Sequence, residues 1–227
     1  MSSTGFFRFP HTPHLVWLGE VPPRADKVLS TQEAEALLAH DVTVEEKVDG
    51  ANVGLSIGED GDLRAQNRGA YVTRDGCHPQ FRPLFRWMHE RRYALLDALP
   101  PHVIVFGEWC YAVHSVRYTR LPDWFLAFDV FDRHTGSFWD MPRRDALCDA
   151  LGLVRVPLIA SGRIALDDVP ALLGPSRLAD GPAEGAYLKW SAGGNAGSRA
   201  KVVRPTFVQG IDTHWSGRTM QVNALAG

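Results

Sequence analysis

Strand-like segments dominate this sequence, and the helical segments between them follow no regular β-α-β alternation. Period-two alternation or a short apolar run predicts strands over 42–47, 51–57, 63–65, 102–109, 125–132, 185–190 and 199–204. Helices are predicted over 31–38, 83–99 and 142–152. Ser30 supplies a cap before the first helix, and Gly152 supplies a stop after the last. This order of elements predicts an α+β fold with antiparallel sheets rather than a doubly wound parallel sheet.

Length and composition are those of a globular protein. The chain has 227 residues, 45% of them apolar, and only twenty residues follow Phe207, so we expect a single domain over 1–227 without a separate C-terminal domain. The start lacks the features of a signal peptide, and no stretch approaches the ~18 apolar residues that span a bilayer. The three cysteines have no paired spacing that would indicate a zinc site or a disulfide framework. We therefore expect a cytoplasmic protein without a membrane partner.

Positive charge is concentrated in one segment, although the net charge is −2. Residues 64–92 contain seven arginines against Asp75 and Glu90, with aromatic residues interleaved. Such a composition suits a surface that follows phosphates and stacks on bases, and Arg82 and Arg86 are candidate contacts. The alternative is a solvated helix face whose aromatic side chains belong to the core.

The densest chemical signal is the segment 45–52, Glu-Glu-Lys-Val-Asp-Gly-Ala-Asn. Lys47 ends a predicted strand and precedes a glycine-containing turn, a position that can present its amine at the mouth of a pocket. Strand parity places Glu45 and Lys47 on one face, with Glu46 on the other. A neutral lysine amine is a nucleophile. The alternative is an exposed lysine paired with Glu45 or Asp49.

Five further segments follow this one in a fixed order. They are AQNRG (65–69), VFGEW (105–109), FLAFDVFD (125–132), EGAYLKW (184–190) and RAKVVR (199–204). With EKVDGAN they resemble the motifs of covalent nucleotidyltransferases, the superfamily of polynucleotide ligases and capping enzymes, and most closely the nick-sealing type of ATP-dependent RNA ligase. The resemblance extends from about residue 42 to residue 207. It implies two antiparallel sheets flanking an ATP pocket.

The resemblance also implies a reaction and a nucleophile. Lys47 would attack the α-phosphate of ATP and keep AMP, which would pass to a 5′-phosphate end before a 3′-hydroxyl seals the strand. Glu108 and Glu184 would hold the ribose and a divalent metal, Mg²⁺ or Mn²⁺. Phe128 would stack on adenine, unless it is one more core aromatic. Asn52 and Arg68 would position the RNA end or the adenylate phosphate, although Asn52 could instead only close its turn.

The last motif departs from the family pattern. Lys201 would contact the α-phosphate, but the usual second lysine is replaced by Val203. Arg199 shares a strand face with Lys201 and is a candidate second cation, whereas Arg204 points to the opposite face. Further candidate nucleotide contacts are Lys189, Glu45 and Glu46.

Several alternatives remain open. The same motifs occur in DNA ligases and capping-type guanylyltransferases, and a non-catalytic RNA-binding module could keep the fold. Expected substrates are RNA ends or a nicked duplex. We expect a monomer, with a partner protein as a possible source of extra strand affinity. His114 is a candidate structural or end-binding residue, and the glycine-rich segment 193–197 is a turn that lacks the P-loop ending.

Overall fold

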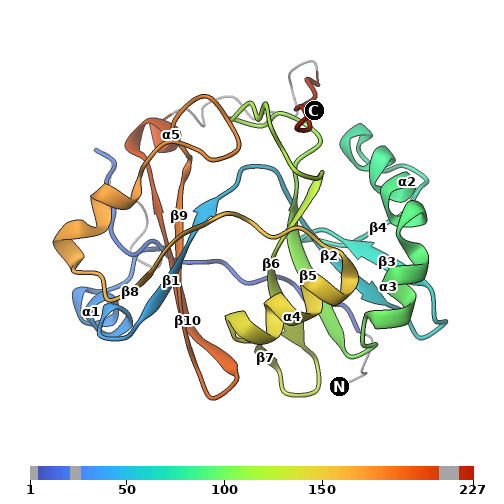
Figure 1. Cartoon of the computed structure of the whole chain (residues 1–227), viewed down its shortest axis with the longest axis horizontal. Coiled ribbons are helices and arrows are strands. Elements are labelled where there is room, and N and C mark those ends of the chain that lie inside the picture. Colours follow the sequence, from blue (N-terminus) through green and yellow to red (C-terminus); the bar gives the residue numbers. More distant parts are fainter. Residues whose placement is uncertain (1–4, 21–26, 210–219) are drawn as a thin grey trace.

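The computed structural model describes residues 5–20, 27–209 and 220–227, and its strands form two antiparallel sheets that stand side by side (Figure 1). The first sheet has the order β10-β9-β1-β8. Its strands are β1 (Val42–Lys47), β8 (Leu158–Gly162), β9 (Gly185–Ala192) and β10 (Asn195–Val203). The second sheet has the order β4-β3-β2-β5-β6-β7. Its strands are β2 (Ala51–Ile57), β3 (Leu63–Gln66), β4 (Tyr71–Val72), β5 (Val103–Trp109), β6 (Phe125–Asp132) and β7 (Ser137–Phe138). The predicted α+β class with antiparallel sheets is confirmed.

Helices cover the outer faces of both sheets (Figure 1). The α-helices are α1 (Thr31–Leu38), α2 (Arg82–Glu90), α3 (Arg92–Ala98), α4 (Met141–Leu151) and α5 (Pro205–Gln209), and the 3₁₀ turns include η2 (Pro79–Phe81) and η3 (Leu166–Leu172). The cap predicted at Ser30 is present as a reciprocal pair with Glu33. The stop predicted at Gly152 is also present, in the left-handed conformation with φ 63°.

The predicted single helix over 83–99 is wrong, because it is broken at Arg91. This residue has φ −106° and ψ 4°, between α2 and α3. A continuous helix would place Arg91 on the same face as the buried Met88 and Leu95. In the broken form the Arg91 guanidinium instead lies over the Trp87 ring and donates to Asp123 at 2.9 Å. The break therefore lets the charged Arg91 side chain, on the core side of the helix, contact Trp87 and Asp123.

Three apolar clusters hold the layers together. One packs the outer face of the second sheet against the helices α2, α3 and α4. Another packs the first sheet against α1 and η3. The third lies between the sheets and includes Phe106, Leu126 and Phe128. The apolar clusters cover the outer faces of both sheets and part of the space between them, and the remaining space between the sheets is where a site can form.

The segment 48–50 carries the chain from the first sheet into the second, from β1 to β2 (Figure 1). It passes so close to β5 that a Cβ on Gly50 would lie 2.6 Å from the carbonyl oxygen of Trp109. Only glycine allows this approach. The turn predicted at 193–197 is shorter than expected, because residues 195–197 belong to β10 and only Gly193 and Gly194, with φ 60° and 84°, join β9 to β10. No helix in the described part of the chain has the length and apolarity to cross a membrane.

Candidate active site

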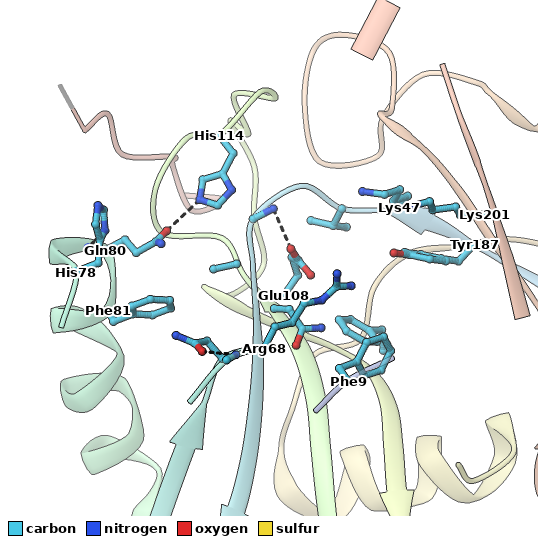
Figure 2. Close-up of a pocket in the computed structure, with 17 residues that line it drawn as sticks. Phe9, Lys47, Arg68, His78, Gln80, Phe81, Glu108, His114, Tyr187 and Lys201 are labelled. Carbon is cyan, nitrogen blue, oxygen red and sulfur yellow. Dashed lines mark hydrogen bonds between the residues drawn. The ribbon is translucent and has the colours of Figure 1, made fainter. Parts of the chain in front are cut away.

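A cavity of about 770 Å³ opens between the two sheets, at the ends of β1, β3 and β5 and the start of β2 (Figure 2). Residues far apart in the sequence meet there because antiparallel pairing aligns their strands. Lys201 pairs with Tyr187, and Asn52 pairs with Glu108. Six of the predicted site residues line the cavity: Lys47, Asn52, Arg68, Glu108, Phe128 and Lys201.

Lys47 is the last residue of β1, and its ammonium faces the cavity. Its Nζ donates to Glu184 Oε2 at 2.6 Å and lies 5.9 Å from the centre of the Tyr187 ring. Burial alone would lower the Lys47 pKa, but the nearby acidic groups, Glu184 first, outweigh it and hold the pKa above its ordinary value. In the free protein this amine is therefore a stabilised cation that must lose a proton before it can attack.

Two carboxylates stand beside Lys47. Glu108 accepts from the backbone N–H of Gly50 at 3.1 Å, and burial raises the pKa of Glu108 to about 8 against the opposing charge of Lys47. Burial also raises the pKa of Glu184, again with Lys47 opposing. Both carboxyl groups thus lie where negative charge is poorly compensated. A further cation in the cavity would favour their charged forms.

Asp49, in the same motif, has a structural role. Its Oδ2 accepts the backbone N–H groups of Ser115 at 2.5 Å and Val116 at 3.0 Å. Its own N–H donates to Tyr118 Oη at 2.7 Å. Through these hydrogen bonds Asp49 holds the turn after Lys47 against the loop after β5, next to the end of β1.

An aromatic wall bounds one side of the cavity. Phe128 is 8% exposed and lines it, whereas Phe125 and Phe131 lie in the core. The Phe9 ring meets Phe128 edge-on at 5.4 Å and also lines the cavity. Sequence reasoning missed Phe9, which lies in a proline-flanked segment without periodicity. It also missed Tyr187, whose strand parity with Lys189 was the available signal.

The family is decided by a match over most of the chain. Residues 40–203 match the family model described as RNA ligase. The chain belongs to the RNA ligase family.

Solved structures with the same fold come from Naegleria gruberi RNA ligase. One variant, with ATP and Mn, has a TM-score of 0.61 and 15% identity, and the match covers 87% of this chain and 58% of that one. Another variant, with AMP and Mn, has a TM-score of 0.60 and 16% identity over 89% and 63% of the two chains. The ligase with PPi gives 0.61 and 14% over 92% and 62%. The chain thus spans about three fifths of these neighbours' length. No curated protein matches it.

In this RNA ligase family member, three predicted nucleotide contacts lie behind the cavity wall. Lys189 Nζ donates to Glu45 Oε2 at 2.8 Å and to the Phe128 carbonyl at 2.6 Å, and it pairs with Asp129 at 3.1 Å. The three donors of the ammonium therefore have acceptors. Arg199 Nη1 donates to Asp129 Oδ2 at 2.5 Å.

Glu45 completes this buried network through Arg144, whose Nη1 donates to it at 2.6 Å and to the Phe128 carbonyl at 2.9 Å. The expectation of direct nucleotide contact is therefore corrected for Glu45, Lys189 and Arg199. Strand parity correctly predicted the sheet face of these three residues, but their side chains lie deeper between the sheets than the cavity does. Their role in this structure is to hold the β6 backbone at Phe128.

Glu46 and Arg204 also lie away from the cavity. Glu46 accepts from Ser176 Oγ at 2.5 Å and from the Arg177 N–H at 2.9 Å, on the other face of β1. Arg204 donates to backbone carbonyls, including Gly174 at 2.6 Å. The prediction that Glu46 contacts the nucleotide is corrected, and neither Arg199 nor Arg204 lines the cavity. Among the residues that the structure describes, the Lys and Arg side chains lining the cavity are Lys47, Arg68 and Lys201.

The predicted nucleic-acid contacts on α2 are outside the cavity but begin at its edge. Arg82 and Arg86 are exposed, and Arg82 directly follows Phe81, which lines the cavity. Arg86 pairs with Glu90 at 2.8 Å in an exposed contact. The aromatic residues interleaved with these arginines divide, because Trp87 is buried in the core while Phe85 lies partly exposed. The aromatic side chains of segment 64–92 thus belong partly to the core, and RNA contact by its arginines stays a prediction.

A cluster elsewhere has the composition of a metal site but not its geometry. His102, Asp132 and His134 lie with ligand atoms within 4.8 Å of one another. However, the two imidazole rings are stacked 4.5 Å apart with planes 6° from parallel. An ion must lie in the plane of each ligating ring, so one ion cannot bind both in this arrangement. The carboxylates beside Lys47 remain the better candidates.

Proposed function

We propose that this chain is an ATP-dependent RNA ligase that carries AMP on Lys47. The Lys47 amine attacks the α-phosphorus of ATP, a P–N bond forms and pyrophosphate leaves. AMP then passes to the 5′-phosphate of an RNA end, and a 3′-hydroxyl displaces AMP to seal the strand. The observation that carries this proposal is the meeting of Lys47, one acid (Glu108), two further cations and an aromatic wall in one cavity, with a second acid, Glu184, bonded to Lys47. Neighbours of the same fold bound to ATP, AMP or PPi support it.

The cations suit the charge that the reaction handles. Phosphoryl transfer depends on positioning and charge neutralisation more than on bonds made by protein groups. Lys201 and Arg68 would contact the phosphates. Burial and the charge of Lys47 lower the pKa of Lys201 to about 8, and a phosphate beside it would favour its charged form.

The acidic pair would hold a divalent metal. Glu108 and Glu184 are oxygen donors, and Mg²⁺ or Mn²⁺ would supply charge neutralisation at the phosphates when bound. The raised pKa of Glu108 fits a carboxylate that lacks a cation in the free protein. The manganese in neighbours of the same fold agrees with this assignment.

Asn52 supplies a further sign of an absent ligand. Its Oδ1 is buried, and no described residue donates a hydrogen bond to it. Buried polar atoms without partners are uncommon in proteins. We assign Asn52, together with Arg68, to the RNA end or the adenylate phosphate.

Substrate class is tested with nicked duplexes. We expect sealing of a nick that has RNA on the 3′-hydroxyl side and poor sealing of an all-DNA nick, measured as product per minute under the same conditions. Equal or better sealing of the DNA nick would assign the chain to DNA ligation. Transfer of GMP in place of AMP would assign it to capping chemistry. Binding of RNA without any nucleotide transfer would leave a non-catalytic module. Action as a monomer and help from a partner protein stay predictions.

Phe128 is predicted to stack on the adenine of ATP. Replacing it with leucine should raise the ATP concentration needed for half-maximal lysyl-AMP formation by about tenfold, because stacking on a base contributes about 1–3 kcal/mol. Phe131→Leu is the matched control, since Phe131 lies on the same strand but stacks on Phe7 in the core. That variant should lower the melting temperature and leave the ATP dependence unchanged. The same pattern in Phe128→Leu would mean that Phe128 only packs.

Arg82 and Arg86 are predicted to contact the RNA backbone. The double alanine variant should form lysyl-AMP normally but bind RNA more weakly. The slope of log Kd against log salt should fall by about 1.4, which is two phosphate contacts at about 0.7 each. Arg163→Ala is the control, an exposed arginine that pairs with Asp41 at the edge of the first sheet. An unchanged slope in the double variant would remove α2 from the RNA path.

A further inference from the structure

The cavity continues past the acids and cations into a second part, which we call the histidine lobe. Its lining residues are His78, Gln80, Phe81 and His114. Figure 2 shows these four on one side of the cavity, Lys47, Lys201 and Tyr187 on the other, and Arg68 and Glu108 between them. Two segments build the lobe, the η2 turn with its cap and the loop after β5. None of the three proposed reaction steps assigns a role to these four residues.

Gln80 gives the histidine lobe a fixed shape. This residue is 2% exposed, and its carbonyl accepts from Trp109 Nε1 at 2.7 Å. Its N–H donates to His78 Nδ1 at 3.3 Å, which caps η2. Its side-chain Oε1 lies 2.9 Å from His114 Nε2. Because an amide oxygen only accepts, His114 Nε2 carries a hydrogen, and the imidazole ring is held in one orientation at the cavity wall.

The chemistry of the histidine lobe differs from that of the rest of the cavity. It offers an amide, two imidazoles and the Phe81 ring, whereas the opposite side offers Lys47 and Lys201, with Arg68 between, and the aromatic wall at Phe128 also lines the cavity. Neutral donors and acceptors beside a ring suit the hydroxyls, base edge and base face of a nucleoside. The cations suit phosphates. Besides the aromatic wall at Phe128, the cavity therefore has one region that suits phosphates and a separate region, the histidine lobe, that suits a second nucleoside.

If the proposed function is right, these regions of the cavity match the product of the second reaction step. An oxygen of the RNA 5′-phosphate attacks the phosphorus of lysyl-AMP. A P–O–P bond forms, the P–N bond to Lys47 breaks, and the nitrogen takes a proton. The product has two nucleosides joined by two phosphates through their 5′ positions. With adenosine at Phe128 and the diphosphate at Lys47, Lys201 and Arg68, the second nucleoside would occupy the histidine lobe, on the other side of Arg68. At about 770 Å³ the cavity is in the upper part of the range for ligand sites.

We propose that the histidine lobe binds the terminal nucleoside of the RNA strand that carries the 5′-phosphate, with His114 as a binding contact. Asn52, whose buried Oδ1 lacks a described donor, lines the same cavity and would serve the phosphate that joins this nucleoside. The strand would then leave past Phe81 onto Arg82, the first residue of α2. The lobe thus connects the nucleotide pocket to the arginine face.

The test separates transfer to RNA from lysyl-AMP formation. Wild type, His114→Ala and His134→Ala are adenylylated with ATP, freed of nucleotide and mixed with a 5′-phosphorylated RNA oligonucleotide in a single turnover. His134 is the control, an exposed histidine that follows β6 at the end of the β5–β6 pair away from the cavity. His114→Ala should slow transfer by about tenfold relative to its own lysyl-AMP formation, the cost of about one lost hydrogen bond. More RNA should restore part of the rate, and His114→Asn should retain more activity than alanine.

Each other outcome overturns the proposal or locates its failure. Equal transfer by His114→Ala and wild type would show that the histidine lobe only closes a loop. A larger loss in lysyl-AMP formation than in transfer would place the lobe in the ATP site. Normal transfer with slow sealing of pre-adenylylated RNA would assign the lobe to the 3′-hydroxyl strand. If wild type forms no lysyl-AMP at all, the proposed function fails, and direct titration of the three proteins with the RNA oligonucleotide still tests the lobe.

Discussion

Lys47→Ala is expected to abolish the transfer of AMP from ATP to the chain. Among the described residues that line the cavity, Lys47 is the lysine at a strand end, and its Nζ lies 2.6 Å from the carboxylate of Glu184. Lys47→Arg should fail as well, because a guanidinium stays protonated and cannot attack. The measurement is retention of label from α-labelled ATP on the denatured protein.

Lys201→Arg is the matched control for this result. Lys201 also lines the cavity, and its pKa of about 8 makes it the rival nucleophile. An arginine at position 201 keeps the positive charge but removes the amine. If Lys47 is the nucleophile, this variant should keep most of its labelling. Labelling that survives Lys47→Ala but not Lys201→Arg would reverse the two roles.

Glu108→Ala and Glu184→Ala should each slow lysyl-AMP formation by at least ~10²-fold, the scale of losing one preorganised electrostatic group. Both carboxyl groups are buried beside Lys47, and Glu184 is also the direct partner of its ammonium. A chelator should stop the reaction in wild type, and Mg²⁺ or Mn²⁺ should restore it. The rates are compared in single turnovers at saturating ATP.

Glu46→Gln provides the contrast for the acids. Glu46 is more deeply buried than they are, and its oxygens accept from Ser176 and Arg177 away from the cavity. This variant should lose stability, with lysyl-AMP formation per folded molecule retained. Near-normal rates in both Glu108→Ala and Glu184→Ala would mean that these acids hold neither the metal nor the lysine.

Sequence patterns predicted the sheets and much of the cavity because both depend on local order. Alternation located β1, β2 and β6, and motif residues at strand ends converge once the strands pair. In contrast, local sequence patterns do not predict how deep a side chain lies between the two sheets. Glu45 and Lys189 were placed on the correct face, yet the contact of Glu45 with Arg144 and that of Lys189 with Asp129 join residues that are 99 and 60 positions apart.

Elements without periodicity were missed for a related reason. β8 (Leu158–Gly162) is a partly exposed edge strand, so it carries no apolar alternation. The break at Arg91 depends on Asp123, which only the fold brings near. The histidine lobe combines residues 78–81 with His114, two loops whose meeting no local pattern indicates. Site residues within or next to a motif, such as Arg68 and Glu184, were predictable, whereas His78 and Gln80, which lie outside the motifs, were not.

Peptide mapping shows directly whether Lys47 is the residue that carries AMP. The chain has only four lysines, Lys27, Lys47, Lys189 and Lys201, so a P–N bonded AMP has few possible positions. Wild-type protein is incubated with ATP and Mg²⁺ or Mn²⁺, its intact mass is measured, and the modified peptide is sequenced by mass spectrometry. We expect the protein to gain the mass of one AMP, located on Lys47. An AMP located on Lys201, or no gain in mass with either metal, would contradict it.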